Sequence, residues 1–409
     1  MEFEYGIIGG GPAGYTTAMA LAQKGHSVVL FEKEQLGGTC LNKGCIPTKS
    51  LLHSSEIYNQ IQRASNYGLD IEIKSFDFTK IAEKRDKTIE RIRKSLELAV
   101  KNSGVNVVYK EACMIDSNTV LADKEYKVGK IIISSGSKPR ELKEFKFDGQ
   151  FILSSDDVLK LNALPKSVLI IGSGAIGIEW ARIFSNFGVE VSIVELAEHL
   201  IPLADIEVSK RIERIFKQKK IQYYIEDSID NIENKKVVLK SGNIIEPDFI
   251  LLALGREPIK VENTDCKILG DACGEIQLAH YAIRQALNYV EGLDTTLNKN
   301  LIPSVIYGEP EIAWVGLRDQ DCNESYQKTI LPITALGKSW CDDSTEGFIK
   351  IISKNDDIVG AHVVSKEASA LVQQILIAMQ VGVKIQELKK VCFAHPTFSE
   401  GIFEAIQRI

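Results

Sequence analysis

A short apolar run, a glycine-rich turn and a helix-like stretch follow one another at the start of the chain. The apolar run occupies residues 6–8, the turn Gly-Gly-Gly-Pro-Ala-Gly occupies residues 9–14, and the helix-like stretch occupies residues 15–24. A second apolar run at residues 28–31 ends at Glu32. This order predicts a strand, a tight turn, a helix and a second strand parallel to the first.

The same order recurs near the middle of the chain. An apolar run at 168–171 leads into the turn Gly-Ser-Gly-Ala-Ile-Gly at 172–177, and after a helix-like stretch a second apolar run at 191–194 ends at Glu195. In both copies the first glycine precedes the acid by 23 residues. One such motif alone is often only a tight turn, but two copies that each have an acid at the same distance rarely arise by chance.

Both turns have the G-x-G-x-x-G spacing of a dinucleotide-binding site. The first glycine permits the turn, the second lets the backbone approach a pyrophosphate, the third lets the helix pack on the strand, and the acid accepts hydrogen bonds from ribose hydroxyls. Because Glu195 would repel a 2'-phosphate and no arginine lies in residues 196–200, the second site is expected to take NAD rather than NADP. The predicted contacts are Gly9, Gly11, Pro12, Ala13, Gly14 and Glu32 in the first copy, and Gly172, Gly174, Ala175, Ile176, Gly177 and Glu195 in the second.

Composition and charge narrow the class of protein. The 409 residues are 44% hydrophobic and 25% charged, enough for two or three packed domains, and the formal net charge is −6. Because Lys and Arg are scattered, neither nucleic acid nor an anionic membrane is expected as a partner. There is no leader pattern before residue 6, no run of about 18 apolar residues and too few cysteines for a disulfide scaffold, so a cytoplasmic, reducing compartment is expected.

Two cysteines, Cys40 and Cys45, stand five residues apart just after the first acid. In a regular helix that spacing puts the two Cα atoms about 9 Å apart, beyond the roughly 7 Å limit for a disulfide, so the chain must bend if they pair. Gly44 and Pro47 make such a bend plausible. The alternatives are two buried free thiols or half of a metal site, which His53 alone does not complete, and no metal is expected.

A histidine and a carboxylate lie close together near the C-terminus, in the run His-Pro-Thr-Phe-Ser-Glu at residues 395–400, after an amphipathic stretch at 368–381. Thiols ionise near pH 8 to 9, so a dithiol substrate needs a base at neutral pH, and an imidazole is suited to that task. Glu400 can orient the ring of His395 and stabilise its charged form. Taken alone, the tripeptide His-Pro-Thr at residues 395–397 would more often place its histidine in a loop without a catalytic role.

The run Gly-Gly-Thr-Cys-Leu-Asn-Lys-Gly-Cys-Ile-Pro-Thr-Lys at residues 37–49 resembles the redox-active motif of the class I pyridine nucleotide-disulfide oxidoreductases, most closely that of dihydrolipoamide dehydrogenase. Segments 134–139, 255–258 and 270–280 and the histidine motif at 395–400 resemble further landmarks of that family, in the same order. The resemblance implies an FAD-dependent enzyme that oxidises protein-bound dihydrolipoyl groups with NAD. Two alternatives are an NADH-dependent reductase of another small disulfide and a catalytically weakened flavoprotein subunit.

The resemblance also implies a role for each matching residue. Cys40 would exchange with the substrate, Cys45 would lie against the flavin with Lys49 nearby, and His395 with Glu400 would reach the cysteines of the other subunit of a homodimer. Glu179 would lie near the nicotinamide, although a carboxylate on a helix surface is an equal alternative. Lipoyl-bearing acyltransferase or glycine-cleavage proteins would be partners. The remaining implied contacts are Lys33, Gly38, Thr39, Ala112, Ser135, Gly136, Asp271, Leu278 and Ala279 for FAD, and Gly255 and Arg256 for NAD.

The predicted fold is α/β, with two Rossmann-like domains and a C-terminal α+β dimerisation domain. The predicted division is an FAD-binding domain at 1–145 and 265–299, an NAD-binding domain at 146–264, and a dimerisation domain at 300–409. Residues 51–66 and 80–101 are expected to be helices, and residues 307–316 an interface strand suited to a sheet edge. The short segments 107–128 and 256–270 leave little room for strands of the family, which are expected to be trimmed or lost.

Overall fold

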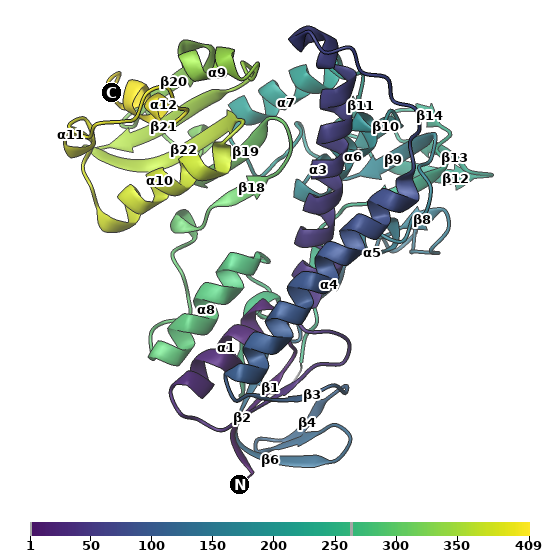
Figure 1. The fold of residues 1–409 in the computed structure, drawn as a ribbon, viewed down its shortest axis with the longest axis vertical. Helices are drawn as coiled ribbons and strands as arrows, with labels where there is room; N and C mark the ends of the chain where they lie inside the picture. Colours follow the sequence, from purple (N-terminus) through teal and green to yellow (C-terminus); the bar gives the residue numbers. More distant parts are fainter. Residues whose placement is uncertain (1, 262–264) are drawn as a thin grey trace.

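The structure is a computed structural model that describes residues 2–261 and 265–409. Its three largest sheets are two mainly parallel sheets and one antiparallel sheet, which lie at the bottom, at the right and at the upper left of Figure 1. Helix α3 (Cys45–Gln62) and helix α4 (Phe78–Asn102) are the longest, and they connect the first sheet with the second. The predicted fold class is confirmed. The exact domain boundaries stay a prediction.

The first sheet contains the first glycine turn. Its strands run in the order β3-β2-β1-β6-β5-β4, and β17 also pairs with β6. The core residues Ile7, Ala18, Val100 and Ala282 join β1 to α1, α4 and α8, so helices cover the apolar strands. The bounds are β1 (Phe3–Ile8), α1 (Pro12–Gln23), β2 (Val28–Phe31), β3 (Asn106–Val108), β4 (Cys113–Asp116), β5 (Thr119–Leu121), β6 (Glu125–Ile133), β17 (Lys267–Ile268) and α8 (Ala279–Glu291).

The shortened segments keep short strands. Within residues 107–128, β4 and β5 form an antiparallel extension of β6. Beyond the second sheet, β16 (Arg256–Pro258) pairs with β7 (Ser137–Pro139), and the two residues of β17 then return to the first sheet. In the described residues these strands are therefore trimmed, as one of the two expected outcomes, and not lost, because strands of two to four residues are enough to make the connections. Residues 262–264 lie outside the described part.

The second sheet contains the second glycine turn, and its strands, in the order β11-β10-β9-β15-β8, are all parallel. Its central strands are continuous apolar runs because both faces are buried. A small antiparallel sheet, β12-β13-β14, lies beside it. The bounds are β8 (Ile152–Leu153), α5 (Ser155–Val158), β9 (Ser167–Ile171), α6 (Ala175–Asn186), β10 (Glu190–Val194), α7 (Ile206–Gln218), β11 (Gln222–Tyr224), β12 (Ile229–Glu233), β13 (Lys236–Leu239), β14 (Ile244–Ile245) and β15 (Phe249–Leu252).

The C-terminal sheet is antiparallel, in the order β18-β19-β22-β21-β20. The strand expected at its edge is β19, which instead pairs on both sides, with β18 and β22. The prediction was wrong because Pro310 precedes the strand, so the ladder loses no N–H donor. The bounds are β18 (Ser304–Ile306), β19 (Glu311–Gly316), β20 (Gln327–Pro332), α9 (Gly337–Cys341), β21 (Phe348–Lys354), β22 (Asp357–Ser365), α10 (Ala368–Val381), α11 (Ile385–Leu388) and α12 (Glu400–Ile406).

No helix in the described part of the chain is both long and apolar enough to cross a membrane.

Candidate active site

One continuous cavity of about 1870 Å³ reaches both glycine turns and both cysteines of the motif. It is lined by 25 of the residues predicted from sequence: Gly9, Gly11, Pro12, Ala13, Glu32, Lys33, Gly38, Thr39, Cys40, Cys45, Lys49, Ala112, Ser135, Gly136, Gly172, Gly174, Ala175, Ile176, Glu179, Glu195, Gly255, Arg256, Asp271, Leu278 and Ala279. Gly14 and Gly177 do not line it. They pack against the turns, since an added Cβ would lie 1.8 Å from Gly9 O and 2.0 Å from Gly172 O, respectively.

The shape of the two turns fits two dinucleotides. At Gly174 an added Cβ would meet no protein atom within 4 Å, and at Gly11 it would meet only Gly38 Cα, at 3.8 Å. The middle glycine of each turn therefore faces open cavity, which is where a pyrophosphate would approach the backbone. Helices α1 and α6 begin directly after these glycines, so their free N–H groups point toward the same space.

The acid after each second strand is buried and bound to its own turn. Glu32 accepts hydrogen bonds from Gly10 N at 2.8 Å and Glu34 N at 2.7 Å. Glu195 accepts from both the backbone N and the Oγ of Ser173, at 2.8 and 2.7 Å. Each carboxylate oxygen has further acceptor capacity, so these bonds hold the acid in place and leave it able to accept from a ribose hydroxyl.

The two cysteines lie on either side of a helix break. Helix α2 (Gly38–Lys43) is followed by Gly44, whose φ is −141° and ψ −109°, and α3 begins at Cys45. The bend that pairing requires is therefore present. Both cysteines are free thiols, and Cys40 forms a side-chain hydrogen bond with Cys45.

The hydrogen bond makes the two thiols unequal. It lowers the pKa of Cys45 to about 7, against the effect of burial and with help from the ammonium of Lys49. The pKa of Cys40 is raised by the same hydrogen bond and by burial, so Cys40 keeps the proton. The reduced pair therefore holds its thiolate on Cys45 near neutral pH.

Lys49 and Glu179 form an ion pair inside the cavity. Lys49 Nζ lies 2.8 and 2.7 Å from the two carboxylate oxygens of Glu179, whose side chain is only 5% exposed. Glu179 is therefore not an exposed carboxylate on a helix surface, which was the alternative interpretation of this residue. Sequence reasoning missed a third member, Tyr307, whose backbone N donates to Glu179 Oε1 at 3.1 Å and whose ring centroid lies 4.7 Å from Lys49 Nζ. Only the fold could reveal this contact, because 128 residues separate Tyr307 from Glu179.

Arg256 contacts residues on both sides of the boundary between the two nucleotide-binding regions. Its guanidinium donates to Ser137 Oγ at 2.9 Å and to Ser137 O at 2.8 Å, and it forms an ion pair of 3.6 Å with Asp156. Ser137 Oγ in turn donates to Asp271 Oδ2 at 2.6 Å. Sequence reasoning did not single out Ser137, although it lies in the landmark at 134–139, and it missed Asp156, which belongs to no recognisable local pattern.

His395 and Glu400 form the expected pair, but away from the cysteines of the same chain. His395 Nδ1 lies 2.7 Å from Glu400 Oε1, and Thr397 N donates to Glu400 Oε2 at 2.8 Å. The Thr397 and His395 hydrogen bonds lower the pKa of Glu400, which keeps it charged. No residue after Gly316 lines the described cavity, and Figure 1 shows α11 and α12 at the upper left, well apart from α3.

Two parallel-sheet nucleotide domains that share a cavity with a pair of adjacent thiols define a class of nucleotide-dependent dithiol oxidoreductases. The pyridine nucleotide-disulphide oxidoreductase family matches residues 3–281, and the dimerisation domain of the same family matches residues 302–406. The chain therefore belongs to this family of flavoprotein oxidoreductases, and the prediction of FAD and NAD as its cofactors is confirmed at the level of the family.

Relatives match over nearly their full length. The dihydrolipoyl dehydrogenases of Bacillus subtilis (strain 168) and Zymomonas mobilis are 30% and 32% identical, cover 98% and 99% of this chain, and are themselves covered to 97%. The Bacillus alignment spans 444 positions against 409 residues here, so this chain lacks segments that the relative has.

Solved structures show the same fold at lower sequence identity. LpdA from Mycobacterium tuberculosis has a TM-score of 0.91, and the HOCl-induced flavoprotein disulfide reductase RclA from Escherichia coli has one of 0.87. Each is 22% identical, and each comparison covers 99% of both chains.

Proposed function

We propose that the protein is a dihydrolipoamide dehydrogenase, which oxidises protein-bound dihydrolipoyl groups and reduces NAD. The observation that carries the proposal is the single cavity that joins the Cys40 and Cys45 pair to both glycine turns. The choice of substrate is supported by the full-length relatives that are named dihydrolipoyl dehydrogenase. Lipoyl-bearing acyltransferase or glycine-cleavage proteins are the proposed partners.

The sulfur chemistry is an exchange at a Cys40–Cys45 disulfide. One substrate thiolate attacks Cys40 Sγ, the S–S bond breaks, and Cys45 leaves as a thiolate. The second substrate thiolate attacks the sulfur now bound to Cys40, which closes the substrate disulfide and releases Cys40. The ammonium of Lys49 lowers the pKa of Cys45 and so favours its departure as a thiolate, when Cys40 no longer carries a thiol proton.

FAD at the first turn supplies the chemistry that connects the dithiol to the nicotinamide, since a flavin accepts two electrons and can give them up as a hydride. The residues proposed to hold it are those of the first turn with Glu32, Lys33, Gly38, Thr39, Ala112, Ser135, Gly136, Asp271, Leu278 and Ala279. Lys49, paired with Glu179, provides a fixed positive charge inside this cavity. Residues 172–177 with Glu195, Gly255 and Arg256 are proposed to hold NAD.

The base is proposed to come from a second copy of the chain. His395 is 77% exposed, its Nδ1 is bound to Glu400, and its Nε2 can take the proton of a substrate thiol. Because the pair lies outside the cavity of its own chain and within the dimerisation domain, a homodimer would bring it to the cysteines of the partner.

The test is the oxidation of free dihydrolipoamide by the FAD-loaded protein. NADH should form with wild-type protein, and both Cys40→Ser and Cys45→Ser should abolish its formation, whereas the exposed Cys341→Ser, outside the cavity, should leave it unchanged. If dihydrolipoamide fails while NADH drives reduction of another small disulfide, the substrate assignment is wrong. Failure of both reactions with FAD bound would favour a catalytically weakened subunit.

A further inference from the structure

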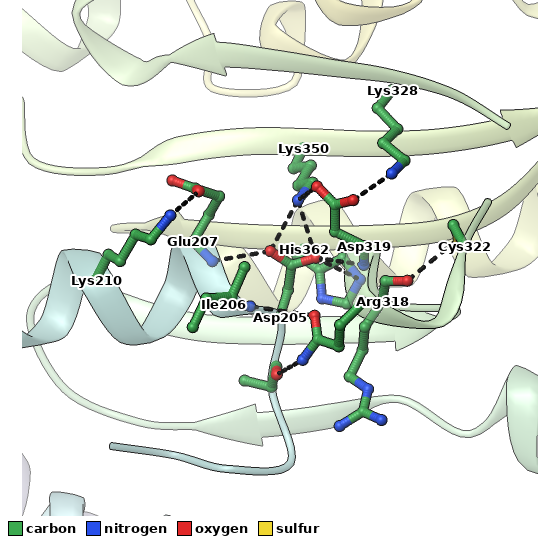
Figure 2. Close-up of polar contacts among 12 residues, drawn as sticks. Asp205, Ile206, Glu207, Lys210, Arg318, Asp319, Cys322, Lys328, Lys350 and His362 are labelled. Carbon is green, nitrogen blue, oxygen red and sulfur yellow. Dashed lines mark hydrogen bonds and ion pairs between the residues drawn. The ribbon is translucent and has the colours of Figure 1, made fainter. Parts of the chain in front are cut away.

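A cluster of buried charges lies where the second nucleotide domain meets the C-terminal sheet (Figure 2). Asp205 comes from the turn before α7, Lys350 from β21 and His362 from β22, and all three are fully buried. Lys350 Nζ lies 2.9 and 3.0 Å from the two oxygens of Asp205 and 2.7 Å from Asp319 Oδ2. Burial lowers the pKa of His362, so the buried positive charge beside Asp205 is that of Lys350, while Lys328 pairs with Asp319 nearer the surface.

Asp205 connects three separate parts of the chain. Besides Lys350, its carboxylate accepts from Glu207 N at 3.0 Å, which caps α7, and from Asp319 N at 2.8 Å. A buried charge is costly to remove from water unless it is fully paired, so this acceptor set fixes where Asp205 can lie. The cluster therefore fixes the end of the loop that leads from Glu195 to Asp205.

That loop forms a wall of the cavity beside the second glycine turn. Leu196, Ile201, Pro202 and Leu203 all line the cavity. Ile201 has a φ of +54°, a left-handed conformation that is rare for a β-branched residue and persists only where the surroundings enforce it. Its backbone N donates to Ser173 Oγ at 3.0 Å, and Ser173 Oγ donates to Glu195. The shape of the loop is thus tied to the acid of the second site.

The C-terminal domain holds this loop from the outside. Gln320 Nε2 donates to Ala204 O at 3.0 Å, and Arg318 donates to Pro202 O at 3.4 Å. Together with the bond from Asp319 N to Asp205, three consecutive residues of one domain contact the nucleotide-side loop of another. Figure 2 shows Arg318 and Asp319 beside Asp205, beneath the strand that carries Lys350.

We propose that Asp205 and Lys350 are positioning residues of the NAD site: their buried ion pair locks the loop at 196–205 to the C-terminal domain and thereby presets Glu195 and the cavity wall for the adenosine half of the nucleotide. The inference rests on the proposed assignment of NAD to the second turn. It extends the site to two residues that do not themselves line the cavity, one of which, Lys350, belongs to the C-terminal domain.

The experiment measures binding of ADP-ribose, which carries the adenosine half of NAD without its redox chemistry, by calorimetry to the FAD-loaded protein. Lys350→Met should raise the Kd about tenfold, and Asp205→Asn should raise it similarly, because either change removes the ion pair. The KM for NAD should rise in parallel while kcat at saturating NAD and the rate of flavin reduction by dihydrolipoamide stay unchanged.

Two further variants serve as a negative control and as a substitute for the charge variants. Lys384→Met removes an exposed lysine that pairs with Asp357 in the same domain, and it should leave the Kd unchanged. Gln320→Leu removes the contacts of one side-chain amide with Ala204 O and Ile206 N and leaves the ion pair intact. It therefore keeps the inference testable if the charge variants do not fold, with an expected rise in Kd of roughly two- to threefold.

The outcomes separate the two proposals. Wild-type affinity for ADP-ribose in every folded variant of Asp205, Lys350 and Gln320 would overturn the positioning role and leave the NAD site standing. No binding of ADP-ribose to the wild type would overturn the NAD site and the positioning role with it. A loss of affinity with an equal loss of flavin reduction would indicate general structural damage and would also overturn the positioning role.

Discussion

At the scale of single residues, the ionisation of Cys45 depends chiefly on the hydrogen bond from Cys40, which lowers its pKa to about 7. A thiolate is the form above the pKa, so thiolate absorbance of the reduced protein should rise as the pH increases through about 7. In Cys40→Ala the donor is lost, and the rise should move up toward the value of about 8.5 for a free thiol. The measurement is ultraviolet absorbance against pH, with Cys45→Ser subtracted.

The matched control for this titration is Cys40→Ser, because a hydroxyl can still donate to the thiolate. Its titration should lie between those of the wild type and Cys40→Ala. An unchanged titration in Cys40→Ala would mean that the hydrogen bond does not set the ionisation and that the charge of Lys49 does.

The buried ion pair between Lys49 and Glu179 should contribute to the stability of the fold. Glu179→Gln would leave the ammonium without its carboxylate and weaken the bond from Tyr307 N. Because Lys49 is 30% exposed, water offsets part of the cost, and the free energy of unfolding should fall by about 1–3 kcal/mol. Urea unfolding measures this change. Glu90→Gln, in an exposed pair with Lys94, should have no measurable effect, and an equal effect of both changes would contradict the special role of the buried pair.

At the scale of elements, substitutions of Gly174 and Gly177 in the second turn should have different effects: one should weaken nucleotide binding and the other should destabilise the fold. In Gly177→Ala the new Cβ would lie 2.0 Å from Gly172 O, so α6 must move away from the turn at a cost of about 1–3 kcal/mol or more. In Gly174→Ala the Cβ meets no protein atom within 4 Å, so the melting temperature should stay unchanged while ADP-ribose binding weakens about tenfold. A lower melting temperature in Gly174→Ala would show that this glycine serves the fold instead.

The bounds of helices and strands that depend on a local sequence pattern could be predicted from the sequence. The strand at 28–31 and the helix at 368–381 have the observed bounds, because each is a continuous apolar or amphipathic run between clear turns. The helix expected at 51–66 in fact begins at Cys45, since the cysteine motif is itself helical on both sides of Gly44. The place of β19 inside its sheet could not be predicted, because its partners come from residues 304–306 and 357–365.

At the scale of the whole molecule, the unpredicted features are those that join distant residues. The contact between Tyr307 and Glu179 and the buried pair of Asp205 and Lys350 span 128 and 145 residues, respectively. Neither has a spacing or composition that could be read locally, because each partner lies on a different domain. The glycine turns and the cysteine motif were predictable for the opposite reason, since their chemistry requires residues adjacent in the sequence.

The separation of His395 from the cavity leads to a prediction about the assembly. If the active site is shared between subunits, Cys40→Ser and His395→Gln should each be inactive as homodimers. When the two variants are unfolded and refolded together in equal amounts, half of the dimers should be mixed. Each mixed dimer then contains one site with an intact Cys40 from one chain and an intact His395 from the other.

The mixture should therefore recover roughly a quarter of the wild-type rate of NADH formation, since half of the dimers each have one working site out of two. If His395 instead serves the cysteines of its own chain, every mixed dimer has two broken sites and no activity returns. Refolding of each variant with itself controls for reactivation by the procedure. Refolding of Cys40→Ser with wild-type protein controls for activity lost during refolding, because shared and unshared sites both predict half of the wild-type rate there.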